Sequence, residues 1–309
     1  MELTSRLAWL LRAVCAAQAL AIAGWIAWRW TASPVQALAG AALIAAIAPC
    51  MLAIEFLLLF WVRKGDPTPR ATIGELLRAW AGETADLAQV FYGRLPFGSR
   101  TIPDHLDPSC VGRTGVVLIH GFVANRGLWN PWMQQMRQQR RACVAVNLEP
   151  VFGSIDDYAP IIEAAVRQVA QLTGRPPVLV CHSMGGLAAR AWLRTTHGPR
   201  RIAHLVTIGS PHRGTWLGRF SSTPNGRQMR QQSAWLADLE RVEAGLPLPP
   251  CTCWYSNCDN IVMPPSTATL PAARNRLLRG VAHVAMAFDP RVVEETFGLL
   301  ESPLPGARK

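Results

Sequence analysis

The sequence predicts an α/β fold, in which a mostly parallel sheet is covered by helices on both faces, preceded by two transmembrane helices. Between residues 111 and 302, short apolar runs alternate with stretches of helical periodicity. One of these runs leads through His-Ser-Met-Gly-Gly directly into a helix. Residues 1–64 consist mainly of two long apolar runs, and residues 65–110 are expected to form a linker and an amphipathic helix.

The N-terminal region predicts a transmembrane helical hairpin. Residues 7–28 and 35–62 are almost entirely apolar, and each run exceeds the roughly 20 residues that cross a bilayer as a helix. The six residues between them are too few for anything but a tight turn. Tryptophans lie at the ends of the runs, as interfacial aromatic residues do: Trp25, Trp28, Trp30 and Trp61. The alternative for the first run, a cleaved signal peptide, is disfavoured because a second apolar run follows at once.

Charged residues in and around these runs predict how the hairpin is oriented. Arg12 is close enough to one end to reach the interface, and Glu55 is expected to pair with Arg12 or to lie protonated between the helices. The turn carries only Arg29. The outer ends carry more positive charge: Arg6, Arg12, Arg63, Lys64 and Arg70. The positive-inside bias therefore predicts an inner-membrane protein whose remaining chain faces the cytoplasm.

The net charge of +11 indicates an anionic partner. Anionic lipid headgroups are favoured over nucleic acid, because no nucleic-acid motif accompanies the charge. The eight cysteines form no recognisable disulfide framework. Cys251, Cys253 and Cys258 lie close in sequence without a fourth ligand at suitable spacing, so we expect buried thiols and no metal.

Residues 65–69 have the composition of a linker, and residues 73–92 have the spacing of an amphipathic helix. Its apolar positions are Ile73, Leu76, Leu77, Trp80, Leu87 and Val90. Such a helix packs on the rest of the protein or lies on the membrane surface, and packing is the favoured alternative.

Ser183 lies at a predicted strand-to-helix turn with the features of a nucleophile elbow. Residues 178–181 form the strand and residues 187–193 the helix. The small Gly185 and Gly186 allow strand and helix to pass closely behind the serine. Cys181 occupies the position of the first glycine in the usual Gly-x-Ser-x-Gly pattern and is small enough to replace it.

The strand before residue 120 ends in a second motif, which together with the elbow is typical of one family. Residues 115–119 are a buried apolar strand that ends in His120-Gly121-Phe122, about sixty residues before the elbow. Together these motifs resemble bacterial lipases of the α/β-hydrolase fold. The resemblance implies that the backbone N–H groups of Phe122 and Met184 form the oxyanion hole, and that His120 is structural. Further strands are expected at residues 142–148, 202–208 and 252–256, and helices at residues 158–172 and from about residue 290.

An insertion at about residues 213–250 interrupts this alternation. Large apolar residues such as Trp216, Phe220 and Trp235 alternate there with arginines such as Arg219 and Arg230, a composition typical of a surface that meets lipid. We interpret it as a lid or acyl-chain wall. A helix that simply packs on the core explains the pattern equally well.

In the α/β-hydrolase fold the catalytic residues run in the order serine, acid, histidine. Of the histidines after Ser183, His204 lies in a predicted strand, His197 lies near a helix end, and His212 comes too early, which leaves His283. Asp259 follows a predicted strand, whereas the other intervening acids lie in the insertion: Asp238, Glu240 and Glu243. The predicted triad is therefore Ser183, Asp259 and His283.

These residues predict a membrane-anchored serine ester hydrolase of lipase type that cleaves acyl esters of lipids through an acyl-enzyme and needs no cofactor. The calcium-binding aspartates of secreted bacterial lipases have no convincing counterpart. One alternative is a carboxylesterase or acyltransferase that acts on soluble esters. Another is a catalytically silent hydrolase fold that serves as a binding protein.

Overall fold

The computed structural model describes residues 5–196, 199–245 and 249–301 and contains one six-stranded sheet. Every pair of neighbouring strands is parallel, and their order is β2-β1-β3-β4-β5-β6. The strands are β1 (Val116–Ile119), β2 (Cys143–Ala145), β3 (Val178–His182), β4 (His204–Ile208), β5 (Cys251–Ser256) and β6 (Arg274–Leu278). The parallel α/β architecture is thus confirmed. The sequence analysis missed β6, an edge strand whose first residues are exposed and polar.

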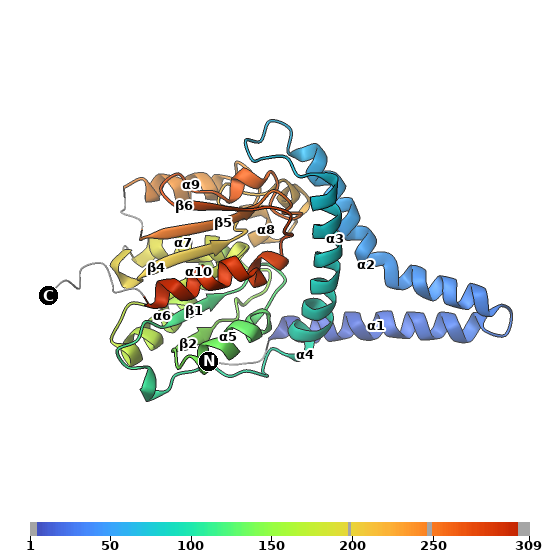
Figure 1. Cartoon of the computed structure of the whole chain (residues 1–309), viewed down its shortest axis with the longest axis horizontal. Coiled ribbons are helices and arrows are strands. Elements are labelled where there is room, and N and C mark those ends of the chain that lie inside the picture. The colour runs from blue at the N-terminus through green and yellow to red at the C-terminus, as the bar shows by residue number, and fades with distance from the viewer. Residues whose placement is uncertain (1–4, 197–198, 246–248, 302–309) are drawn as a thin grey trace.

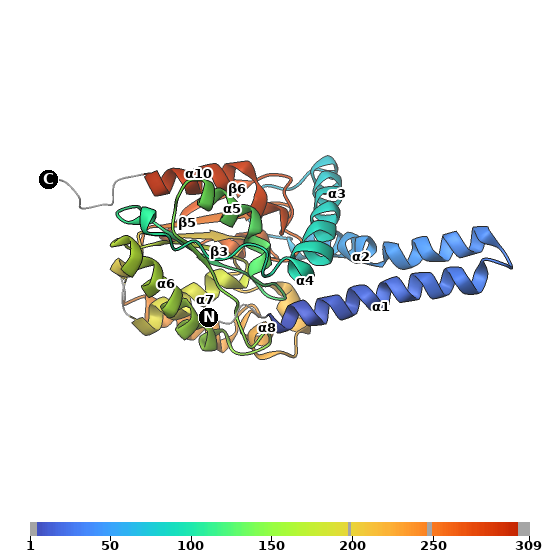
Figure 2. The same cartoon turned by 90° about the horizontal axis from the view of Figure 1, so that it is seen from below.

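Helices cover both faces of the sheet (Figures 1 and 2). One face carries α6 (Ala159–Thr173), α7 (Met184–Thr196) and α9 (Ala234–Glu243), and the other carries α5 (Asn130–Gln138) and α10 (Pro290–Glu301). The central strands are apolar on both sides because both sides are buried. The carboxyl ends of the strands are where such sheets place their functional loops.

Two N-terminal helices, α1 (Arg6–Arg29) and α2 (Pro34–Val62), form an antiparallel hairpin that projects away from the sheet (Figure 1). Both are long and apolar enough to cross a membrane. The two helices approach closely where the Trp25 ring lies against Gly40, which leaves no room for a side chain at residue 40. Most large apolar side chains of the hairpin point outward, including Leu20 and Leu43, each 72% exposed.

The next helix, α3 (Ile73–Gln89), crosses the base of the hairpin between α2 and the sheet domain (Figures 1 and 2). A capping box between Thr72 and Glu75 begins it. A π-helical turn over Val90–Arg94 follows, and then the short α4 (Leu95–Phe97). The helix buries Ala79 and Glu83, whereas Ile73 and Leu77 remain exposed.

The expected pairing of Arg12 with Glu55 is wrong. Arg12 donates from Nε to the carbonyl oxygen of Pro96 at 2.7 Å, and its guanidinium lies over the rings of Trp9 and Phe97. Glu55 accepts a hydrogen bond from Asn260 Nδ2 at 2.7 Å. The two residues are at the domain end of different helices, so each finds a partner in the nearest part of the domain.

The insertion at residues 213–250 contains a 3-10 helix (Trp216–Phe220), α8 (Pro224–Gln228) and α9. Its residues 246–248 are outside the described residues. Leu236 and Leu239 of α9 are buried in the core, and Glu243 forms an ion pair with the buried Arg190 of α7. This packing agrees with the alternative that the insertion is a helix packed on the core. The interpretation of the insertion as a lid stays a prediction.

Candidate active site

The turn between β3 and α7 has the strained geometry of a nucleophile elbow. Ser183 has φ of 53°, in the left-handed region that residues with side chains rarely adopt. Its backbone N–H donates to the carbonyl oxygen of Ile208 on β4 at 2.8 Å, which holds the turn in place. A Cβ atom on Gly185 would lie 2.5 Å from the carbonyl oxygen of Ile119. Helix α7 therefore passes over the end of β1 at a distance that only glycine permits.

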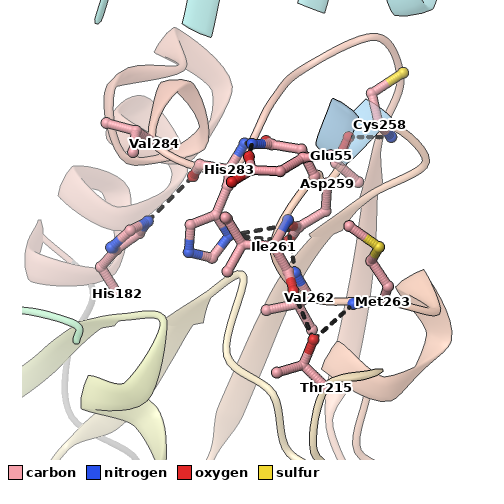
Figure 3. Close-up of polar contacts among 12 residues, drawn as sticks. Glu55, His182, Thr215, Cys258, Asp259, Ile261, Val262, Met263, His283 and Val284 are labelled. Carbon is pink, nitrogen blue, oxygen red and sulfur yellow. Dashed lines mark hydrogen bonds and ion pairs between the residues drawn. The ribbon is translucent and has the colours of Figure 1, made fainter. Parts of the chain in front are cut away.

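Asp259 and His283 meet across two loops that follow β5 and β6 (Figure 3). The imidazole Nδ1 of His283 donates to both carboxylate oxygens, at 3.0 and 3.2 Å. The backbone N–H groups of Ile261 and Val262 donate to Asp259 Oδ1 at 2.9 and 2.8 Å. Because Nδ1 carries the donated proton, Nε2 is left as the basic nitrogen of the neutral ring.

Ser183 and His283 line one cavity of about 260 Å³, with Asp259 behind the imidazole. Phe122 lines the same cavity immediately after β1. Met184 is the first residue of α7, so its N–H is among those without a partner inside the helix. The structure therefore brings the predicted serine, base and acid together, next to both predicted oxyanion residues.

Two glycines leave room for the serine and the base. A Cβ atom on Gly121 would lie 2.7 Å from Ser183 Cβ. Gly209 has φ of 56°, and a Cβ there would lie 3.1 Å from His283 Nδ1. Neither glycine has a side chain that could react. Each leaves the space that the neighbouring side chain occupies, Gly121 for Ser183 and Gly209 for His283.

The pKa of His283 is raised above its ordinary value of 6.5. Burial alone acts in the opposite direction, since it disfavours the charged ring. The nearby charge and hydrogen bond of Asp259, helped by the charge of Glu83, outweigh burial. A base with this environment holds a proton more firmly than a free imidazole does.

Two further histidines, His120 and His182, lie near His283, but burial lowers their pKa values instead of raising them. His120 donates from Nδ1 to the carbonyl oxygen of Gly121 and accepts at Nε2 from the N–H of Leu148, so both ring nitrogens are occupied. Burial lowers the pKa of His120 to about 4. His182 donates from Nε2 to the carbonyl oxygen of His283 at 3.1 Å, and burial with the charge of His283 lowers its pKa to about 3.

The histidines rejected on sequence grounds lie elsewhere. His204 is in β4 and interacts with Thr252 at 2.9 Å. His212 is fully buried against Thr207 and Arg190. His197 is outside the described residues.

Two carboxylates from the N-terminal helices hold the loops of Asp259 and His283, and the sequence analysis missed this role for both. Glu83 of α3 accepts from the N–H groups of Val284 and Ala285, with distances of 2.9 to 3.2 Å. Glu55 of α2 accepts a hydrogen bond from Asn260, whose Oδ1 accepts the N–H of His283 at 3.1 Å. Helix α2 and helix α3 are thus joined directly to the residues next to Asp259 and His283.

A signal for Glu83 was present in the sequence. It lies four residues after Ala79 and seven after Leu76, which puts a carboxylate on the apolar face of an amphipathic helix. Burial raises the pKa of Glu83 to about 7, against the weaker lowering effect of the two backbone donors. No comparable pattern marks Glu55 as a partner of Asn260, because the two residues are 205 positions apart.

Comparison with known proteins identifies related folds. A sequence model of the alpha/beta hydrolase family matches residues 116–301. The mature form of Bacillus licheniformis lipase BlEst2 is similar in structure, with a TM-score of 0.55 and 16% identity over 61% of this chain and 92% of that one. Aspergillus fumigatus lipase B has a TM-score of 0.55 and 16% identity over 66% and 56% of the two chains. Legionella pneumophila phospholipase PlaB has a TM-score of 0.50 and 13% identity over 62% and 60%.

Proposed function

Because the chain belongs to the alpha/beta hydrolase family, we propose that it is a membrane-anchored serine hydrolase of lipase type that cleaves acyl esters of lipids. The observation that carries the proposal is the shared cavity of Ser183 and His283, with Asp259 bonded to the far side of the imidazole. The proposed catalytic residues are these three, with the N–H groups of Phe122 and Met184 as the oxyanion hole.

In this mechanism Ser183 Oγ attacks the ester carbonyl while His283 Nε2 takes the hydroxyl proton. The carbonyl oxygen becomes an oxyanion, which the two backbone N–H groups stabilise by a few kcal/mol each. His283 then gives the proton to the departing alcohol, which leaves an acyl-enzyme. Water attacks the acyl group with His283 again acting as the base, and the carboxylic acid and free Ser183 result. Asp259 keeps the imidazole in the required tautomer throughout.

The proposed organisation has three parts: a transmembrane hairpin at residues 1–64, a linker and helix at residues 65–110, and the hydrolase domain at residues 111–302. The apolar exposed surface of α1 and α2 supports the anchor. The positive charge at their outer ends supports an inner-membrane location with the domain on the cytoplasmic side.

A hollow at the domain end of α2 supports anionic headgroups as partners. Arg63, Lys64 and Arg70 line it together with apolar residues. Positive side chains beside a membrane segment attract anionic lipid surfaces by about 1 kcal/mol each.

The test is hydrolysis by the full-length protein, reconstituted in phosphatidylglycerol vesicles, with Ser183→Ala as the control. Release of fatty acid from a vesicle lipid, together with its loss in the variant, is the expected result. If the protein hydrolyses soluble short-chain esters but no vesicle lipid, the result would favour an esterase that acts on soluble substrates. A well-folded protein that hydrolyses neither would support the silent binding protein.

A further inference from the structure

Part of the lining of the active-site cavity comes from the N-terminal helices. Leu52 and Glu55 of α2 line it, and so do Glu83 and Leu87 of α3. The π-helical turn after α3 adds Phe91 and its neighbour Val90. Among the described residues, none between 213 and 245 lines this cavity. Part of the cavity that holds Ser183 is therefore formed by the segment that begins as the proposed membrane anchor, and the described part of the insertion does not contribute.

A second hollow of about 370 Å³ lies between the hairpin and α3. Its walls are mostly small or apolar: Cys15, Ala19 and Ile22 of α1, Ala45, Ala48 and Pro49 of α2, and Thr84, Leu87 and Ala88 of α3. Two polar side chains also line it, Gln18 of α1 and Tyr92 of the π-helical turn, and the Tyr92 hydroxyl donates to Gln18 Oε1 at 2.7 Å. We call this hollow the hairpin groove. Leu87 is the one described residue that lines both the hairpin groove and the active-site cavity, so the two hollows adjoin at this side chain.

If α2 crosses the bilayer from the turn of the hairpin, the roughly 20 residues that span the hydrocarbon core end near residue 53, so the groove residues Ala45, Ala48 and Pro49 lie within the domain-side half of the core. Helix α2 has 29 residues, whereas roughly 20 cross the hydrocarbon core. Its last part packs on the protein, where Leu52, Phe56 and Leu59 are buried. On α1, the hydrogen bond from Arg12 to Pro96 marks the corresponding contact with the domain. The groove begins between these contacts and the apolar remainder of the hairpin, which Figure 1 shows projecting from the domain.

Pro49 helps to keep this side of α2 open. Proline has no N–H, so the carbonyl of Ala45 lacks its usual partner inside the helix. The carbonyl of Pro49 accepts from Trp80 Nε1 of α3 at 3.0 Å, which ties the two helices together just beyond the groove. Small residues on both sides, Ala48 and Ala88, leave space between the helices there.

We propose that the hairpin groove is an acyl-chain site, through which one chain of a bilayer lipid passes Leu87 to bring its ester to Ser183. This inference rests on the proposed ester hydrolase activity and names how its substrate arrives: sideways from the adjoining leaflet, between α2 and α3. The surfaces that the chain meets are mostly apolar, and Ser183 and His283 line the cavity but not the groove. The polar side chains among them have partners: Tyr92 donates to Gln18 in the groove, and in the cavity Glu55 accepts from Asn260 and Glu83 accepts from the backbone after His283. An extended chain with one terminal ester matches that distribution.

The test compares a long-chain ester in vesicles with a soluble short-chain ester, both fluorogenic. Leu87→Trp fills the passage between the two hollows. We expect the ratio of kcat/KM for hexadecanoate over butanoate to fall at least about tenfold, in the range that a misfitting apolar pocket imposes. Leu77→Trp is the matched control on the same helix, because Leu77 is 61% exposed and lines neither hollow. The ratio for this control is expected to stay unchanged.

A second pair of variants tests the hairpin groove away from the catalytic residues. Ala45 lines the groove but not the active-site cavity, so Ala45→Trp is expected to lower the same ratio. Leu43→Trp, at an outward position of the same helix, is the control. An unchanged ratio in both Leu87→Trp and Ala45→Trp, with wild-type activity intact, would overturn the acyl-chain site. Absence of hydrolysis in the wild type would instead contradict the proposed function.

Discussion

Glu83 offers a direct test of whether helix α3 buries a titrating carboxylate against the loop of His283. Its carboxylate is buried and accepts the backbone N–H groups that follow His283. Glu83→Gln removes the titration and keeps the size of the side chain and one acceptor oxygen. The variant therefore separates the effect of a buried charge from the effect of the contacts.

The magnitude follows from the pKa of Glu83, which burial raises from 4.5 to about 7. The folded state then binds a proton more firmly than the unfolded state, so this group's contribution to stability is fully present below pH 4.5 and is lost as the pH rises through 7. Between pH 5 and pH 8 the two pKa values give a loss of about 2 to 3 kcal/mol from this one group. Glutamine has no such titration, so the variant lacks this loss.

The assay is thermal unfolding of the wild type and of Glu83→Gln in a neutral detergent at both pH values. We expect the midpoint of the wild type, relative to the variant, to fall by about 5 °C between pH 5 and pH 8. Glu75→Gln on the same helix is the control. Its pKa is lowered to about 2, chiefly by hydrogen bonds from Arg279 and Thr72, so its folded form is charged at both pH values. A Glu83→Gln difference that is the same at both pH values would refute the buried titrating carboxylate.

Three further predictions concern the proposed catalytic residues and a glycine beside them. Asp259→Asn removes the charged acceptor that fixes the imidazole tautomer and should lower kcat for a soluble ester about 10³- to 10⁴-fold. A small effect on kcat would exclude Asp259 as the orienting acid. Gly121→Ala places a Cβ 2.7 Å from Ser183 Cβ and should lower kcat/KM about 10²-fold without unfolding the domain, as circular dichroism would show. The pH profile of kcat/KM should fall on the acid side with an apparent pKa above 6.5, because only neutral His283 accepts the serine proton; a value below 6.5 would contradict the raised pKa.

The sheet and the elbow could be predicted because local sequence determines them. Four apolar residues followed by Ser183 and two glycines specify a strand, a strained turn and a helix, whatever the rest of the chain does. Asp259 and His283 follow from the same logic, since parallel strands bring their carboxyl ends together. The edge strand β6 escaped because its exposed Arg274 and Asn275 do not have the apolar pattern of a buried strand.

The apolar-face position of Glu83 marks it as a buried carboxylate, but the partners of the N-terminal helices could not be predicted, because they depend on contacts between distant parts of the chain. Glu55 lies in an apolar run, and the pattern there describes only a membrane segment. Its partner Asn260 becomes visible only once α2 lies against the loop after β5. The same holds for Leu87, whose position between the hairpin groove and the cavity depends on how three helices pack.

The central claim, that Ser183 is an activated nucleophile, is tested most directly by labelling the detergent-solubilised full-length protein with a fluorophosphonate and mapping the adduct by peptide mass spectrometry. We predict a single phosphonylated peptide that carries the modification on Ser183, and no labelling of Ser183→Ala. A well-folded wild type that remains unlabelled, or an adduct on another serine with Ser183 unmodified, would contradict the account.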